Sequence, residues 1–124
     1  MADTDERPPV WIGHVTLATP DLDGTHEFMV RLGMRPIARG EGFAVFELRG
    51  GTHLVLLPAE EPCDGPADFD LMVEDIDATR AHFEELGLAP SAVRTGKVHR
   101  SFTVKSPSGH AITFNSNHVS SRPV

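Results

Sequence analysis

Residues 21–33 read DLDGTHEFMVRLG, and residues 75–87 read DIDATRAHFEELG. Both stretches begin with Asp-x-Asp-x-Thr and end with Leu-Gly, and they keep the same internal spacing. A second pair follows in the same order, because GTHLVL at residues 51–56 corresponds to GHAITF at residues 109–114. Two matched blocks in one order indicate that the chain contains an internal duplication.

Each copy has the pattern of one helix between strands. In the first copy, Asp21 or Asp23 can accept hydrogen bonds from the free backbone N–H groups that begin a helix. Apolar positions then continue at roughly helical spacing to Leu32, and Gly33 is a typical left-handed stop. Polarity alternates over residues 12–18, which predicts a half-buried strand before the helix. Three more strands are expected after the helix, with turn-forming glycines between them, near residues 35–39, 43–48 and 52–57.

The second copy repeats this plan. We expect a strand at residues 69–73, a helix at 76–86 and strands near 91–94, 100–105 and 111–115. The sequence thus predicts an α+β fold in which two tandem βαβββ modules form a curved mixed sheet around a cavity, with the helices outside. A single domain over residues 1–124 is expected, divided into module one at 10–58, a linker at 59–67, module two at 68–116 and a polar tail at 117–124.

The composition excludes some classes of partner. Eleven Lys and Arg against 18 Asp and Glu give a formal net charge of −7, which repels phosphate backbones and anionic lipid surfaces. We therefore expect no nucleic-acid partner and no membrane partner, and no apolar run reaches the ~18–20 residues of a membrane span. The polar segment from Met1 to Pro9 lacks the features of a secretory signal. Cys63 is the only cysteine, so no internal disulfide is possible, and a cytoplasmic location is expected.

The strand pattern separates an apolar face from a polar one. If apolar residues such as Val15, Leu17 and Leu54 pack against the helices, the residues between them face the cavity. This cavity-facing set comprises His14, Thr16, His53, Val55, Asp68, Asp70, Met72, Ala111, Thr113 and Asn115. The set is too polar for a core, because a buried polar group without a partner costs about 1–3 kcal/mol. The face is therefore expected to hold water, a ligand or a metal ion.

Five groups of motifs extend over most of the chain. They are IGHV at residues 12–15 with PDLD at 20–23, LGM at 32–34, GTHL at 51–54, VEDID at 73–77 and SPSGH at 106–110. Their order, spacing and duplication resemble the vicinal oxygen chelate superfamily, which includes glyoxalase I, bleomycin-resistance proteins, extradiol dioxygenases and several epimerases. The resemblance implies a small-molecule pocket and a homodimer. It leaves open whether the pocket lies within one chain or across the dimer.

The family's metal site takes one ligand from the first and one from the last strand of each module. By resemblance these positions fall on His14, Val55, Asp68 and Thr113. His14 matches the family pattern, and Asp68 stands where histidine is usual. Val55 cannot coordinate a metal, and the neutral hydroxyl of Thr113 is a poor donor to a divalent ion. The resemblance thus implies His14 and Asp68 as ligands of one divalent metal ion (Fe, Mn, Ni or Zn), while a metal-free pocket is supported equally.

Other side chains of the polar face are expected to contact a substrate. These candidate substrate-binding residues are His53, Val55, Asp70, Thr113 and Asn115, and no catalytic residue is assigned. His53 or Glu47 could also complete a displaced metal site, whereas the simpler interpretation is a polar pocket wall and a surface glutamate. His99 lies in a loop, where it is either solvated or reaches over the pocket mouth.

Three functions are compatible with these observations. The first is a glyoxalase-, bleomycin-resistance- or dioxygenase-like protein that binds a small molecule in an internal pocket, as a metal-dependent lyase, isomerase or dioxygenase with a degenerate metal site. The second is a metal-free homodimer that sequesters a drug or metabolite, as bleomycin-resistance proteins do. The third is a structural or regulatory dimer with a vestigial pocket. Glyoxalase I activity is disfavoured, because Val55 and Thr113 occupy the positions of its acidic metal ligands.

Overall fold

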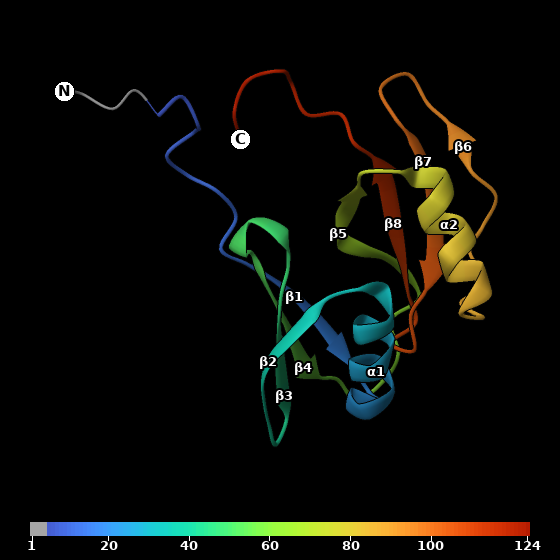
Figure 1. Cartoon of the computed structure of the whole chain (residues 1–124). Helices are drawn as coiled ribbons and strands as arrows, with labels where there is room; N and C mark the ends of the chain where they lie inside the picture. The colour runs from blue at the N-terminus through green and yellow to red at the C-terminus, as the bar shows by residue number, and fades with distance from the viewer. Residues whose placement is uncertain (1–4) are drawn as a thin grey trace.

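The computed structural model describes residues 5–124, which form two modules with the same order of elements (Figure 1). The first module contains β1 (His14–Thr19), α1 (Leu22–Leu32), β2 (Arg35–Gly40), β3 (Phe43–Glu47), the 3-10 turn η1 (Arg49–Gly51) and β4 (His53–Pro58). The second contains β5 (Gly65–Val73), α2 (Ile76–Glu85), β6 (Arg94–Thr95), β7 (Arg100–Lys105) and β8 (His110–Ser116). The predicted α+β fold of tandem βαβββ modules is confirmed.

Each module forms its own four-stranded mixed sheet. The strand orders are β1-β4-β3-β2 and β5-β8-β7-β6. In both sheets the first strand runs parallel to the last, and the remaining neighbours are antiparallel. The edge strands β1 and β5 lie near each other where the modules meet. The two sheets are separate and open and do not close on each other.

Aspartates begin both helices, as the duplicated motif predicts. Asp21 is the N-cap of α1, and its Oδ1 accepts a hydrogen bond from the Gly24 N–H at 2.9 Å. In α2, Asp75 Oδ1 accepts the Ala78 N–H at 3.0 Å. Helix α1 ends at Gly33, whose φ of 105° is left-handed and therefore favours glycine.

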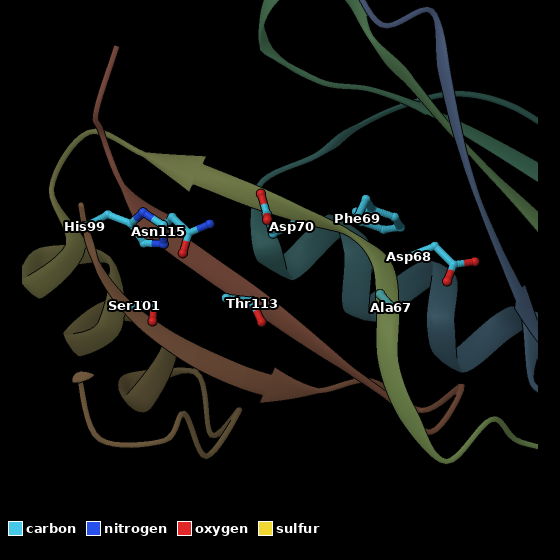
Figure 2. A pocket seen from close by; sticks show the side chains of 8 residues that line it. All are labelled: Ala67, Asp68, Phe69, Asp70, His99, Ser101, Thr113 and Asn115. Atoms are coloured by element: carbon cyan, nitrogen blue, oxygen red, sulfur yellow. The ribbon is translucent and has the colours of Figure 1, made fainter. Parts of the chain in front are cut away.

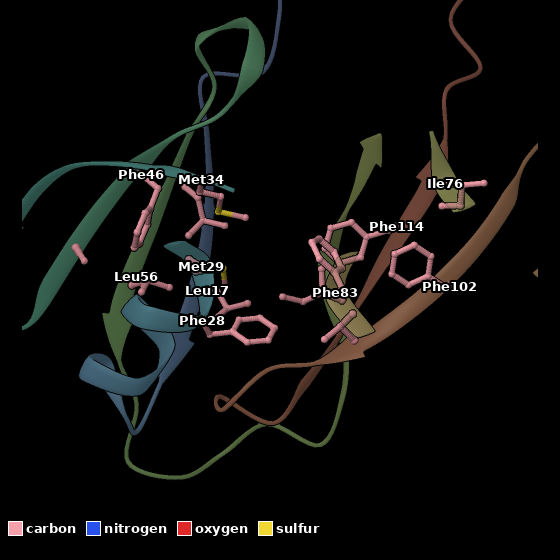
Figure 3. Close-up of a cluster of buried hydrophobic side chains, with 14 residues drawn as sticks. Leu17, Phe28, Met29, Met34, Phe46, Leu56, Ile76, Phe83, Phe102 and Phe114 are labelled. Atoms are coloured by element: carbon pink, nitrogen blue, oxygen red, sulfur yellow. The ribbon is translucent and has the colours of Figure 1, made fainter. Parts of the chain in front are cut away.

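One helix covers one face of each sheet, and the apolar side chains lie between the two layers (Figure 3). In module one, Phe28 and Met29 of α1 are buried in the same cluster as Leu56 of β4. In module two, the ring of Phe83 from α2 meets Phe114 edge-on, with centroids 5.1 Å apart. The apolar positions that alternation assigns to the helix side are all buried or packed against this cluster: Val15, Leu17, Leu54, Leu56, Phe69, Leu71, Ile112 and Phe114. The predicted strand parity is thus confirmed for the regular strands, whereas Phe69, on the irregular stretch of β5, also lines a hollow on the opposite face.

Two strands differ in extent from the sequence prediction. The strand expected near residues 91–94 is reduced to Arg94–Thr95, because the Thr103 N–H of β7 is taken by the Ser91 side chain (2.9 Å) and not by a backbone carbonyl. Strand β5 begins at Gly65, inside the segment expected to be a linker. Pro66 is tolerated there because β5 is an edge strand, which need not donate from every residue.

Within residues 5–124, neither helix has the length and apolar character to cross a bilayer. Residues 1–4, part of the N-terminal segment that argued against a secretory signal, lie outside the described residues.

Asp21→Ala should lower the free energy of unfolding by about 1 kcal/mol, because it removes the side-chain acceptor that caps α1. Asp21→Asn should retain most of the stability, since asparagine caps equally well. Asp23 is the matched control, because its carboxylate pairs with Arg39 at the surface and caps nothing. Urea unfolding followed by circular dichroism measures all three variants. A larger loss in Asp23→Ala than in Asp21→Ala would show that the cap is wrongly assigned.

Candidate functional site

The faces of the two sheets that point away from the helices are open and mostly polar. Strand alternation sends every second side chain to these faces. On the first sheet the side chains include His14, Thr16, Phe43, Val45, Glu47, His53, Val55 and Leu57, and on the second they include Asp68, Asp70, Met72, Ser101, Thr103, Ala111, Thr113 and Asn115. Most are half-buried or exposed, whereas their neighbours along each strand pack under a helix. A ligand on these faces would therefore meet polar groups without disturbing the core.

A cluster of polar side chains occupies the open face of the first sheet. His14 and His53 lie directly opposite each other on β1 and β4, with ring centroids 5.7 Å apart. His53 is also opposite Glu47 of β3, and its Nε2 lies 3.2 Å from Glu47 Oε2. Arg35 of β2 pairs with the same carboxylate. The Arg35 guanidinium, with a further contribution from His53, holds the pKa of Glu47 below its ordinary value. The carboxylate is therefore ionised at neutral pH and compensated by a neighbouring cation.

The open face of the second sheet is hollowed into a pocket of about 280 Å³ (Figure 2). It is lined by Ala67, Asp68, Phe69, Asp70, His99, Ser101, Thr113 and Asn115. Asp70 of β5 is opposite Thr113 of β8, and Asn115 of β8 is opposite Ser101 of β7. Three adjacent strands thus contribute polar side chains to one small hollow.

Two nitrogen or oxygen atoms of this pocket are buried without a hydrogen-bond partner among the described residues. One is Oδ1 of Asn115, a residue that is only 4% exposed. The other is Nδ1 of His99, whose ring stacks on His118 with centroids 5.1 Å apart. Buried polar atoms of native proteins are nearly always paired with protein or water, so a water molecule or a ligand would supply the partner of each atom.

A larger groove of about 940 Å³ runs between the two modules. Its walls include Met34 and Leu48 of module one, strand β5, and Val119 of the C-terminal tail. Asp68 and Asp70 line this groove as well as the smaller pocket.

The sequence-predicted site residues fall into two groups. The small pocket brings together Asp68, Asp70, Thr113 and Asn115. His14, His53 and Val55 lie on the other sheet and line neither hollow. Within one chain the larger groove takes Glu47 from the first open face and Asp68, Asp70 and Met72 from the second, but His14, His53 and Val55 stay outside it.

The positions that resemblance assigns to a metal site are divided in the same way. His14 and Val55 stand on the first sheet, and Asp68 and Thr113 stand on the second. Over residues 5–124, no three His, Cys, Asp or Glu side chains are grouped so that they could hold one ion. Because Val55 has no donor atom and Thr113 offers only a neutral hydroxyl, the residues present do not fit the family's metal site.

Two residues of these faces were not anticipated. The first is Arg35. If β2 and β3 paired without interruption from Gly40 and Phe43 onward, Pro36 would lie opposite Glu47. A β-bulge between Pro36 and Ala38 shifts the register by one residue and places Arg35 opposite Glu47. The second is Ser101. Its place on the open face could have been predicted from the sequence, because the apolar residues Phe102 and Val104 alternate with it along β7 and face the helix. His99, expected to be either solvated or at the pocket mouth, is half-buried and lines the pocket.

Comparison with solved structures finds the same fold in proteins of several kinds. Lactoylglutathione lyase from Agrobacterium tumefaciens superposes with a TM-score of 0.76 at 20% identity, covering 90% of this chain and 97% of that one. The bleomycin resistance determinant encoded on the transposon Tn5 superposes with a TM-score of 0.72 at 17% identity, covering 89% of this chain and 100% of that one. TnmS3, an antibiotic binding protein from Streptomyces sp. CB03234, superposes with a TM-score of 0.69 at 21% identity, covering 86% of this chain and 95% of that one. Identities this low show a common fold and not a common activity.

The sequence itself matches a family model but no individual curated protein. A search of curated protein sequences found no match. The model of the Glyoxalase/Bleomycin resistance protein/Dioxygenase superfamily matches residues 11–114. With two βαβββ modules over the same span, the chain belongs to this superfamily, the vicinal oxygen chelate group that its motifs resemble.

Proposed function

We propose that the protein is a homodimer that binds a small organic molecule, without a metal ion, between the open sheet faces of two copies. The observation that carries the proposal is the pocket on the second sheet, where Asn115 is buried with Oδ1 unpaired. Leaving such an atom unpaired costs about 1–3 kcal/mol, and either a bound water or a ligand that donates a hydrogen bond would remove that cost. In the bound state, the Oδ1 atom of Asn115 would then have a hydrogen-bond partner.

A second copy is part of the proposal because one open sheet face supplies only one wall. Small-molecule sites usually enclose about 70–90% of the ligand surface, which a shallow hollow on a sheet cannot do. The open faces also carry Phe43, Leu57 and Met72, which are 39%, 41% and 46% exposed. Contact between the first sheet of one copy and the second sheet of the other would bury these side chains and close the pocket.

Binding without chemical change is favoured by the loss of metal ligands at Val55 and Thr113. Among proteins of this fold, the Tn5 bleomycin resistance determinant and the antibiotic binding protein TnmS3 carry names that fit such a role. We place the protein in the cytoplasm, where its single thiol, Cys63, would stay reduced.

The protein should sediment as a dimer at micromolar concentration, and Leu57→Glu should weaken the dimer on the order of 100-fold, because it places an unpaired charge in the contact. Val30→Glu is the matched control, since Val30 is equally exposed (42%) but lies on α1. Analytical ultracentrifugation measures all three proteins. A wild-type monomer, or equal weakening by Val30→Glu, would contradict the proposed contact.

Some members of a panel of drugs and metabolites should raise the melting temperature of the wild type, because a ligand that binds only the native state stabilises it by mass action. Ser101→Phe should abolish this rise by filling the pocket. Lys105→Phe, on the same strand and the same face but outside the pocket, should leave the rise intact. Equal ligand responses in wild type and Ser101→Phe would place the binding site elsewhere.

The second candidate function is a metal-dependent lyase, isomerase or dioxygenase. It is favoured by the exposed side chains of His14 and Asp68, which two copies could bring together on facing sheets. Protein purified without chelator should contain far less than one equivalent of Fe, Mn, Ni or Zn by elemental analysis. Stoichiometric metal that disappears in His14→Ala, but not in His26→Ala on α1, would overturn the metal-free proposal.

A further inference from the structure

We propose that the pocket on the second sheet is a subsite for an organic cation with N–H donors, such as an amidinium, guanidinium or primary ammonium group. This inference rests on the proposed small-molecule function and names the chemistry that its ligand should present. The pocket is lined by two carboxylates and by no Lys or Arg. Hydroxyl and amide oxygens adjoin the carboxylates and add further acceptors.

The two carboxylates of the pocket have no neutralising partner among the described residues. Asp68 and Asp70 form no ion pair and no hydrogen bond within residues 5–124, whereas Glu47, Glu74 and Asp77 are each paired with an arginine. Both line the pocket from β5, two residues and therefore ~7 Å apart along the chain, on a stretch whose pairing with β8 is irregular. A hollow with two uncompensated negative charges repels anions and attracts cations.

A buried acceptor stands beside these charges. Asn115 is 4% exposed, its Oδ1 has no partner, and Figure 2 shows its amide between His99 and Asp70. Ser101, opposite Asn115, adds a hydroxyl oxygen to the same hollow. A donor-rich cation could thus reach a carboxylate, an amide oxygen and a hydroxyl at once, and amidinium, guanidinium and ammonium groups each present several N–H donors.

The spacing favours an organic cation over a bare metal ion. Two ligands of one Ca²⁺ or Mg²⁺ ion each lie within about 2.0–2.6 Å of it, so their oxygens are at most ~5 Å apart. Side chains ~7 Å apart along a strand do not converge in that way without moving, and no three candidate ligands are grouped within residues 5–124. A group that spreads its charge and donors over several atoms spans the distance.

The test uses three molecules of the same shape and different charge: benzamidine (cation), benzamide (neutral) and benzoate (anion). Each is titrated into the full-length protein at low salt, and amide shifts are followed by two-dimensional NMR. Benzamidine should produce saturating shifts at Ser101, Thr113 and Asn115 at millimolar concentration. It should bind about tenfold or more tightly than benzamide, because charge-assisted hydrogen bonds are roughly twice as strong as neutral ones.

Asp70→Asn should weaken benzamidine binding about tenfold, because it replaces a carboxylate with a neutral isostere. Asp64→Asn removes the same charge from an exposed position outside the pocket and should leave the affinity unchanged. Equal weakening by both variants would mean that benzamidine responds only to the net charge and would overturn the subsite.

Preferred binding of benzoate or benzamide at Ser101 and Thr113 would overturn the cation subsite while the proposed small-molecule pocket stands. An absence of shifts with benzamidine would also overturn the subsite. The proposed function would then still be tested independently, by the melting-temperature panel and by sedimentation.

Discussion

Each sheet is covered by a helix on one face only, and the rest of the structure depends on this constraint. Side chains alternate along a strand, so apolar and polar neighbours must separate onto opposite faces. On β4 the difference is sharp, because Leu54 and Leu56 are fully buried while His53 and Val55, which alternate with them, are half-buried. The core fills the space under the helices, and the polar side chains are left on a face that a single chain does not cover.

The parallel pairing of the first and last strand of each module decides which polar residues meet. It brings His14 beside His53, and Asp70 beside Thr113, although each pair is far apart in the sequence. The duplication would repeat the same geometry in both modules if the strands were equally regular. Strand β5 is irregular between Pro66 and Asp70, and Asp68, the counterpart of His14, lies within that irregular stretch. Asp68 therefore lacks the cross-strand partner that His14 has.

The helices, the order of helices and strands along the chain, and the two faces could be predicted because each depends on local patterns. Caps at Asp21 and Asp75, alternation from His14 to Thr19, and glycine turns are all visible in the residues themselves. The pairing of Arg35 with Glu47 could not be predicted, because it depends on a bulge that no residue pattern marks. How β1 and β5 approach each other could not be predicted either, since it depends on the whole fold.

The two open faces differ in charge although they descend from one duplicated unit. On the first sheet, Glu47 is compensated by Arg35, so that face is close to neutral overall. On the second sheet, Asp68 and Asp70 have no cation among the pocket residues, so part of the net charge of −7 is concentrated there. If two copies place these faces opposite each other, the closed pocket has one nearly neutral wall and one negative wall. A ligand with a cationic end and a neutral end would then bind in one orientation, with its cation beside Asp68 and Asp70. In the reversed orientation both carboxylates would be buried away from water without a counter-charge, which is costly.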